Sequence, residues 1–134
     1  MIRILLAEDD AGDVLLVEQA LDEHQIVYEL FVVRDGAEAL AFVANMGEPG
    51  HARCPDVVLL DLNLPKIDGP EVLRRFRKHP QCARTPVIVI SSSDAPKDRT
   101  RMTELGIAHY FKKPSDFDEF LKLGGLVRDV AGTR

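Results

Sequence analysis

The chain lacks the features that mark several common protein classes. It has no run of about eighteen apolar residues, so we expect no segment that crosses a membrane. The first residues already follow a strand pattern, which leaves no room for a secretory signal peptide. Acidic residues outnumber basic ones, 22 against 17, and the net charge of −5 argues against direct nucleic-acid binding through a basic surface.

The chain also lacks two local motifs, a pair of cysteines with CxxC spacing and a glycine-rich turn for binding phosphate. Cys54 and Cys82 stand apart without CxxC spacing, so we interpret both as reduced thiols without a role, as expected in the cytoplasm. No glycine-rich turn follows the first apolar run. This excludes the phosphate-binding loop of an ATP-using kinase and argues against a nucleotide or flavin binder.

What the chain does contain is an alternation of short apolar runs and amphipathic stretches, which is typical of βα units. We predict strands at residues 2–7, 28–33, 55–60, 86–90 and 108–112. We predict helices at about residues 12–23, 35–46, 68–78, 96–105 and 115–129. These elements nearly exhaust the sequence, so we expect a single domain over residues 1–134, with no output domain.

Three of the strand patterns, at 2–7, 55–60 and 86–90, are continuously apolar. Such runs are typical of parallel strands that helices cover on both faces. The pattern therefore predicts an α/β fold with a doubly wound five-stranded parallel sheet. The strand order of the flavodoxin-like (βα)5 class, 2-1-3-4-5, places these three strands at the centre, so we expect that class.

Polar residues stand at the ends of four predicted strands: Glu8, Asp9 and Asp10 after the first, Asp61 after the third, Ser91 after the fourth and Lys113 after the fifth. In an open α/β sheet these ends meet in the crevice where ligands bind. Two carboxylates about 4 Å apart repel by roughly 4 kcal/mol at an effective dielectric constant near 20. Such a cluster predicts a bound cation and a reactive aspartate. Oxygen ligands suit Mg²⁺, whereas histidine and thiolate ligands for zinc are missing.

Four motifs carry a family resemblance: EDD around Asp9, LLDLNLPKIDG around Asp61, VIVISSS at the fourth strand and YFKKP at the fifth. Their order and separation over the whole chain resemble the CheY-like receiver domain of two-component response regulators. By this resemblance, Asp61 accepts a phosphoryl group. Glu8 and Asp9 hold Mg²⁺, Glu8 through a water molecule, and the backbone carbonyl of Asn63 completes the metal site.

The same resemblance assigns the remaining site residues. Ser91 bonds a phosphoryl oxygen, and Lys113 pairs first with Asp61 and then with the phosphoryl group. The peptide bond between Lys113 and Pro114 is expected to be cis, an uncommon isomer. Phosphorylation moves the Ser91 hydroxyl and turns Tyr110 inward. The surface from the fourth helix through the fifth strand to the fifth helix then changes its affinity for a partner.

Neighbouring residues offer alternatives within this site. The run 91–93 holds three serines, but only Ser91 directly follows the apolar run. Lys112 competes with Lys113, and the alternation along the strand favours Lys113. Asp10 is a possible third metal ligand, but we interpret it as solvated or as the cap of the first helix.

Two other functions fit the sequence less well. A haloacid-dehalogenase-type phosphatase needs a second aspartate two residues after its nucleophile, and this chain has Asn63 there. A receiver that acts as an adaptor without phosphorylation is an alternative, although all the site residues are present. We therefore expect a single-domain response regulator that receives its phosphoryl group from a histidine kinase. It is expected to catalyse only its own phosphotransfer and dephosphorylation.

A finer resemblance is to stand-alone receivers that serve phytochrome-type histidine kinases, a subgroup that is commonly dimeric. It depends on EDD followed by Asp13, the long loop 47–54 and the stretch RCPDVVLLDLNLPKIDG. Apolar residues of the last helix spread over about 220°, wider than the usual stripe of about 100°. This predicts a homodimer through the fourth helix, fifth strand and fifth helix. The alternatives are deeper burial of that helix or a break at Gly124–Gly125.

Overall fold

The computed structural model describes residues 1–51 and 53–132, which form one five-stranded parallel sheet. Its strands are β1 (Ile2–Ala7), β2 (Tyr28–Val33), β3 (Val57–Asp61), β4 (Val87–Ser91) and β5 (His109–Lys112). The order is β2-β1-β3-β4-β5, which confirms the predicted flavodoxin-like topology. The predicted strands differ from the observed ones only by one or two residues at their ends.

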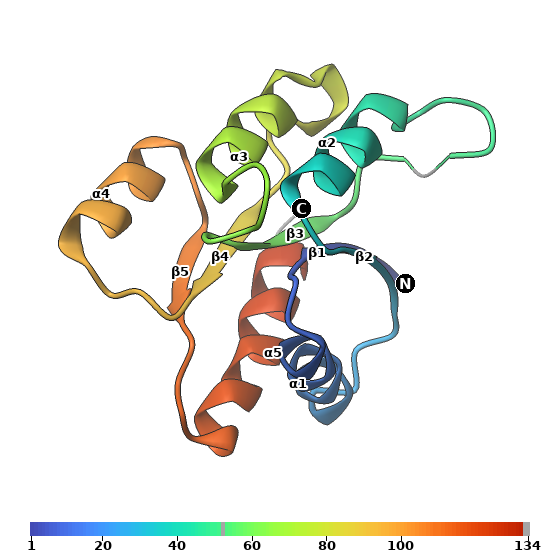
Figure 1. Ribbon diagram of the computed structural model, residues 1–134. Coiled ribbons are helices and arrows are strands. Elements are labelled where there is room, and N and C mark those ends of the chain that lie inside the picture. Colours follow the sequence, from blue (N-terminus) through green and yellow to red (C-terminus); the bar gives the residue numbers. More distant parts are fainter. Residues whose placement is uncertain (52, 133–134) are drawn as a thin grey trace.

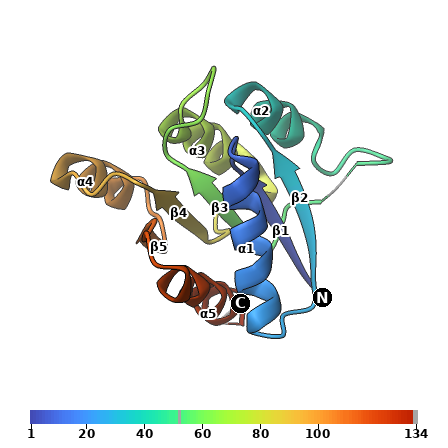
Figure 2. The ribbon, with the colours of Figure 1, turned by 60° about the horizontal axis from the view of Figure 1, so that its bottom comes forward.

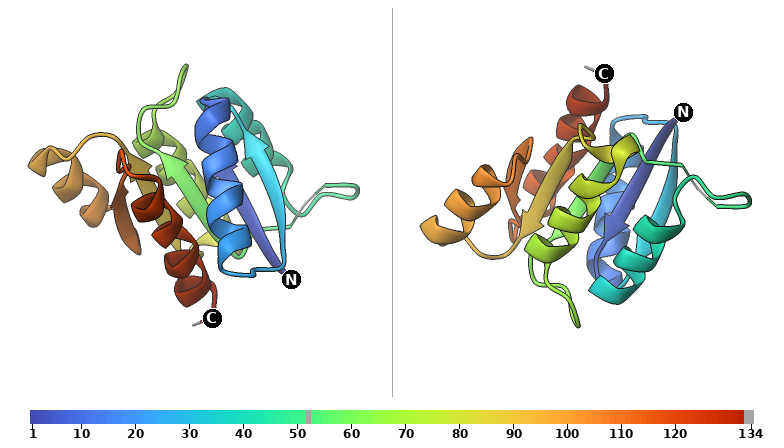
Figure 3. Two further views of the ribbon diagram at one scale, coloured as in Figure 1. Left: turned by 90° about the horizontal axis from the view of Figure 1, so that it is seen from below. Right: turned by 90° about the horizontal axis from the view of Figure 1, so that it is seen from above.

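Five α-helices cover the sheet on both faces. They are α1 (Ala11–Glu23), α2 (Gly36–Asn45), α3 (Gly69–Lys78), α4 (Pro96–Glu104) and α5 (Phe117–Gly132), and a short 3-10 helix, η1 (Pro80–Cys82), follows α3. Figure 1 shows α1 and α5 on one face and α2 and α3 on the other, and Figure 3 shows each face in turn, with α4 on the side of α3. None of the helices in the described part of the chain is long and apolar enough to cross a membrane.

The two faces of the sheet have separate apolar cores. Within β1, Ile4 and Leu6 pack with α1 and α5, whereas Leu5 and Ala7 pack with α2 and α3. The same alternation in β3 and β4 leaves every residue of these two strands buried. This explains why the central strands are continuously apolar, since each side chain faces a layer of helices.

Helix α5 continues without a break through Gly124 and Gly125. Figure 2 shows it side by side with α1. Seven apolar residues produce its wide apolar arc. Four of them are buried (Phe120, Leu123, Val127 and Val130), Leu121 and Leu126 are partly buried, and Phe117 is exposed. Deeper burial therefore accounts for most of the apolar arc, so the arc by itself does not require a second contact.

The two cysteines form a disulfide, so the expectation of two separate reduced thiols is wrong. Cys54 precedes β3 and Cys82 ends η1, and their Cα atoms lie 5.8 Å apart across a sequence separation of 28 residues. Spacing rules for cysteine detect local motifs. This pair is brought together by the return of the chain through α3, which such rules do not detect.

Candidate functional site

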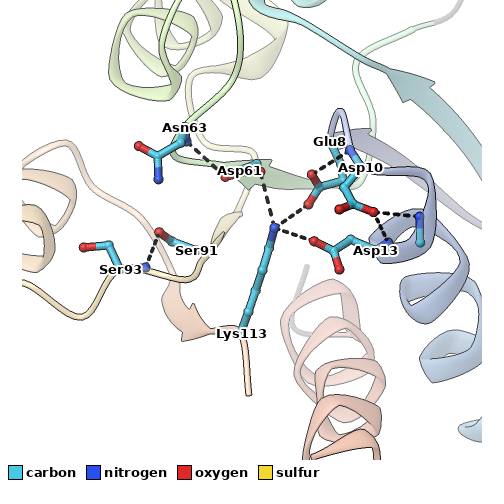
Figure 4. Close-up of polar contacts among 9 residues, drawn as sticks. Glu8, Asp10, Asp13, Asp61, Asn63, Ser91, Ser93 and Lys113 are labelled. Atoms are coloured by element: carbon cyan, nitrogen blue, oxygen red, sulfur yellow. Dashed lines mark hydrogen bonds and ion pairs between the residues drawn. The ribbon is translucent and has the colours of Figure 1, made fainter. Parts of the chain in front are cut away.

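The predicted site residues lie at the edge where β1, β3, β4 and β5 end. Glu8 directly follows β1, Asp61 and Ser91 are the last residues of β3 and β4, and Lys113 directly follows β5. Figure 4 shows their side chains in one group. Glu8, Asp61 and Ser91 are buried. The parallel topology alone produces this arrangement, because all strands end on the same side.

The ammonium group of Lys113 is the centre of the polar contacts. Its Nζ lies 2.7 Å from Oε1 of Glu8, 2.8 Å from Oδ2 of Asp13 and 3.3 Å from Oδ2 of Asp61. The lysine side chain is only 15% exposed. Charged groups withdrawn from water in this way need partners of opposite charge, and Lys113 has three.

Burial and charge shift the protonation equilibria of this group. Burial raises the pKa of Glu8 to about 7, although its hydrogen bond to Lys113 acts in the opposite direction. Burial also works against the charged form of Lys113, but hydrogen bonds to Asp13 and Glu8 outweigh it and raise the lysine pKa. Lys113 therefore stays charged, whereas Glu8 exchanges a proton near neutral pH when no cation is bound.

Three of the acids fit a divalent cation. Carboxylate oxygens of Glu8, Asp9 and Asp61 all lie within 4.8 Å of one another. An all-oxygen set of this kind suits a hard divalent ion. Asp10 instead caps α1, and its side chain accepts hydrogen bonds from the backbone N–H groups of Gly12 and Asp13. This confirms that Asp10 is a capping residue.

Asn63 and Lys112 lie close in sequence to two site residues, Asp61 and Lys113. The backbone N–H of Asn63 donates to Oδ1 of Asp61 at 3.0 Å, so the loop after β3 holds the aspartate in place. Lys112 is exposed and Lys113 reaches the acids, as the alternation along the strand predicts.

The Lys113–Pro114 bond is trans, so the expectation of a cis bond is wrong. The two isomers of an X–Pro bond differ by only about 0.5–1 kcal/mol, and sequence pattern alone does not choose between them.

The loop between β4 and α4 links Ser91 to Tyr110. The Ser91 hydroxyl accepts a hydrogen bond from the backbone N–H of Ser93 at 3.0 Å. The Tyr110 hydroxyl donates to the backbone carbonyl of Ser93 at 2.9 Å. The guanidinium carbon of Arg99 lies 4.5 Å from the centre of the Tyr110 ring, and Arg99 also pairs with Asp94. Tyr110 is thus hydrogen-bonded to the loop that begins at Ser91, beside the crevice.

Comparison with known proteins identifies the family. The model of the response regulator receiver domain matches residues 4–123. The chain belongs to the response regulator receiver family. This receiver is 38% identical over 120 residues to the response regulator Rcp1 of Synechocystis sp., a match that covers 90% of this chain and 82% of Rcp1.

Solved structures of related proteins share the fold throughout. The crystal structure of the phosphorylated cyanobacterial phytochrome response regulator RcpA has a TM-score of 0.88 at 35% identity, covering 99% of this chain and 96% of RcpA. The Mn²⁺-bound form of Rcp1 has a TM-score of 0.84 at 36% identity, covering 96% and 93% of the two chains. The receiver is therefore homologous to phytochrome response regulators, and its acidic cluster fits the binding of a divalent metal.

Sequence reasoning did not assign a role to Asp13. Its carboxylate is as close to Lys113 as that of Glu8, within 0.1 Å (2.8 against 2.7 Å). A signal was present, because Asp13 is the acidic residue in the first turn of the helix that directly follows Glu8–Asp10. The contact itself joins residues 100 positions apart.

Proposed function

We propose that this receiver is a phosphorylation-dependent switch in which Asp61 accepts a phosphoryl group from a sensor histidine kinase. The observation that best supports this proposal is the position of Asp61 in the site. This aspartate belongs to the acidic cluster whose geometry fits a cation and also lies 3.3 Å from the ammonium of Lys113. A carboxylate between a metal site and a lysine has the positive charge around it that attack on an anionic phosphoryl group needs.

In the proposed reaction, a carboxylate oxygen of Asp61 attacks phosphorus. The new P–O bond forms as the P–N bond to the histidine of the kinase breaks. The electron pair of that bond returns to the imidazole nitrogen, which then takes a proton from solvent. Lys113 and the hydroxyl of Ser91 bind oxygens of the transferred group.

Mg²⁺ is the proposed cation, held by Glu8, Asp9, Asp61 and the backbone carbonyl of Asn63. When bound, it would offset the negative charge that accumulates between donor and acceptor. Hydrolysis of the aspartyl phosphate by water returns the receiver to its starting state. The protein thus catalyses its own phosphotransfer and dephosphorylation and turns over no metabolic substrate.

The output of the switch is proposed to pass through Ser91 and Tyr110. A phosphoryl oxygen on Asp61 would accept a hydrogen bond from the Ser91 hydroxyl, and turning of this side chain toward the phosphoryl group would break the bond that it now accepts from the N–H of Ser93. Movement of that loop would loosen the Tyr110–Ser93 bond and let the ring turn inward. Residues of α4, β5 and α5 would then present a changed surface.

The partners follow from the family and the fold. We propose a phytochrome-type histidine kinase as the donor, a cytoplasmic location, and a single receiver domain over residues 1–134. A homodimer through α4, β5 and α5 is also proposed, because β5 is an edge strand of the sheet. Sedimentation with and without beryllofluoride tests the dimer, and a monomer under both conditions rejects it.

The decisive experiment measures intact mass after incubation with Mg²⁺ and acetyl phosphate, alongside the Asp61→Asn variant. We expect one added phosphoryl group in the wild type, none in the variant, and none when EDTA removes the metal. Equal phosphorylation of the variant would show that Asp61 is not the acceptor. A wild type that binds Mg²⁺ but gains no phosphoryl group would indicate an adaptor that signals without phosphorylation.

A further inference from the structure

Asp13 lies in the first turn of α1 and reaches across the crevice to β5. Its Oδ2 accepts a hydrogen bond from Nζ of Lys113 at 2.8 Å, while Asp61 lies farther from the same nitrogen, at 3.3 Å. The backbone of Asp13 is fixed as well, because its N–H donates to the capping side chain of Asp10 at 3.1 Å. Figure 4 shows Asp13 on the α1 side of the ammonium.

The three acids that hold Lys113 are not equivalent. Glu8 and Asp61 also belong to the acidic cluster with Asp9 that fits a cation, whereas Asp13 does not belong to it. A cation in this cluster and the ammonium of Lys113 therefore draw on the negative charge of the same two carboxylates. Among the described residues, Asp13 is the acidic partner of Lys113 that lies outside this cluster, so its charge serves the lysine alone.

We propose that Asp13 is a positioning residue that keeps the Lys113 ammonium on the α1 side of the crevice, so that Glu8 and Asp61 stay available to the cation. This inference rests on the proposed function, in which those carboxylates help to hold Mg²⁺. The physical reason is burial. An ammonium that is only 15% exposed has little water to replace a lost partner, so without Asp13 it pairs more tightly with Glu8 and Asp61.

The test is a double-mutant cycle read by calorimetric titration with Mg²⁺. Asp13→Asn keeps the shape of the side chain and removes its charge. We expect this variant to bind Mg²⁺ about tenfold more weakly than the wild type, near the lower end of the range for coupled sites. In a Lys113→Gln background, the same substitution should change the affinity by less than about twofold, because there is no ammonium left to redirect.

Glu23→Gln is the matched control for loss of one negative charge from α1. Glu23 is exposed and lies ten residues further along the helix, about 15 Å away at 1.5 Å per residue. That distance exceeds the Debye length of about 8 Å at physiological salt, so its effect on Mg²⁺ affinity should be below about twofold. Asp13→Glu keeps the charge and should bind Mg²⁺ within about threefold of the wild type.

The outcomes separate the possible roles of Asp13. Unchanged Mg²⁺ affinity in Asp13→Asn overturns the proposal. Equal weakening with and without Lys113 also overturns it, because Asp13 would then act on the cation directly. If Asp13→Asn does not fold, Asp13→Glu decides, and a tenfold loss despite the retained charge rejects the electrostatic role. A wild type that binds no Mg²⁺ overturns the metal site itself, and the positioning role with it.

Discussion

The contact between α1 and α5 makes a specific prediction about two adjacent glycines. A methyl group at Gly124 would overlap the backbone carbonyl of Ala20 on α1 and would lie 2.5 Å from Cδ2 of His24. A methyl group at Gly125 would approach only the His24 ring, at 3.3 Å from Cε1. The first obstacle is backbone, whereas the second is a side-chain ring that needs to shift by only a few tenths of an ångström and can keep its 3.0 Å hydrogen bond with the Leu121 carbonyl.

The expected magnitudes follow from this difference. Helix propensity favours alanine over glycine by about 1 kcal/mol at both positions. At Gly124 the carbonyl has no rotamer to change, so α1 and α5 must move apart, and overpacking of this kind costs about 3 kcal/mol. We expect Gly124→Ala to lower the free energy of unfolding by about 2 kcal/mol. Gly125→Ala should change it by less than about 1 kcal/mol.

Urea unfolding followed by far-ultraviolet circular dichroism measures both variants against the wild type. With a slope of about 2 kcal/mol per molar urea, the midpoint of Gly124→Ala should fall by about 1 M. Gly125→Ala is the matched control, because it makes the same substitution one residue along the same helix. A Gly124→Ala protein at least as stable as the wild type would refute the close contact between α1 and α5.

Three further predictions concern protonation, the disulfide and the switch. Because burial raises the pKa of Glu8 to about 7, Mg²⁺ must displace a proton below that pH. In calorimetric titrations, the affinity of the receiver for Mg²⁺ should fall by up to about tenfold for each pH unit below about 7. In Glu8→Gln, which has no proton to displace at this position, the affinity should not show this dependence on pH. Reducing Cys54–Cys82 should lower the free energy of unfolding by about 3–4 kcal/mol, and urea curves unchanged by dithiothreitol would contradict this. Tyr110→Phe loses the bond to Ser93 and should cost about 1 kcal/mol, measured by thermal unfolding.

Much of the fold was predictable because it depends on neighbouring residues. The continuously apolar runs at β1, β3 and β4 require helices on both faces, and the observed cores satisfy this. The position of the site followed from the same pattern. Polar residues such as Asp61 and Ser91 end apolar strands, and parallel strands end on one side of a sheet.

Contacts between distant segments were not predictable in this way. The pairing of Cys54 with Cys82 depends on how the chain returns through α3 to η1. Gly124 reads in the sequence as a helix-weakening residue, yet the structure requires the missing side chain, because α5 approaches the backbone of α1 there. Neither fact is visible in local periodicity or spacing.

The sequence by itself determined which strands are buried on both faces, the edge of the sheet that carries the acids, and the family to which the chain belongs. Those follow from hydrophobic periodicity and from motifs that each span a few residues. Only the tertiary structure decided which acidic side chains form ion pairs with Lys113. Its contact with Asp13 joins residues 100 positions apart and depends on where α1 starts relative to the end of β5. Such a distance is set by the packing of helices on the sheet, which no short stretch of sequence encodes alone.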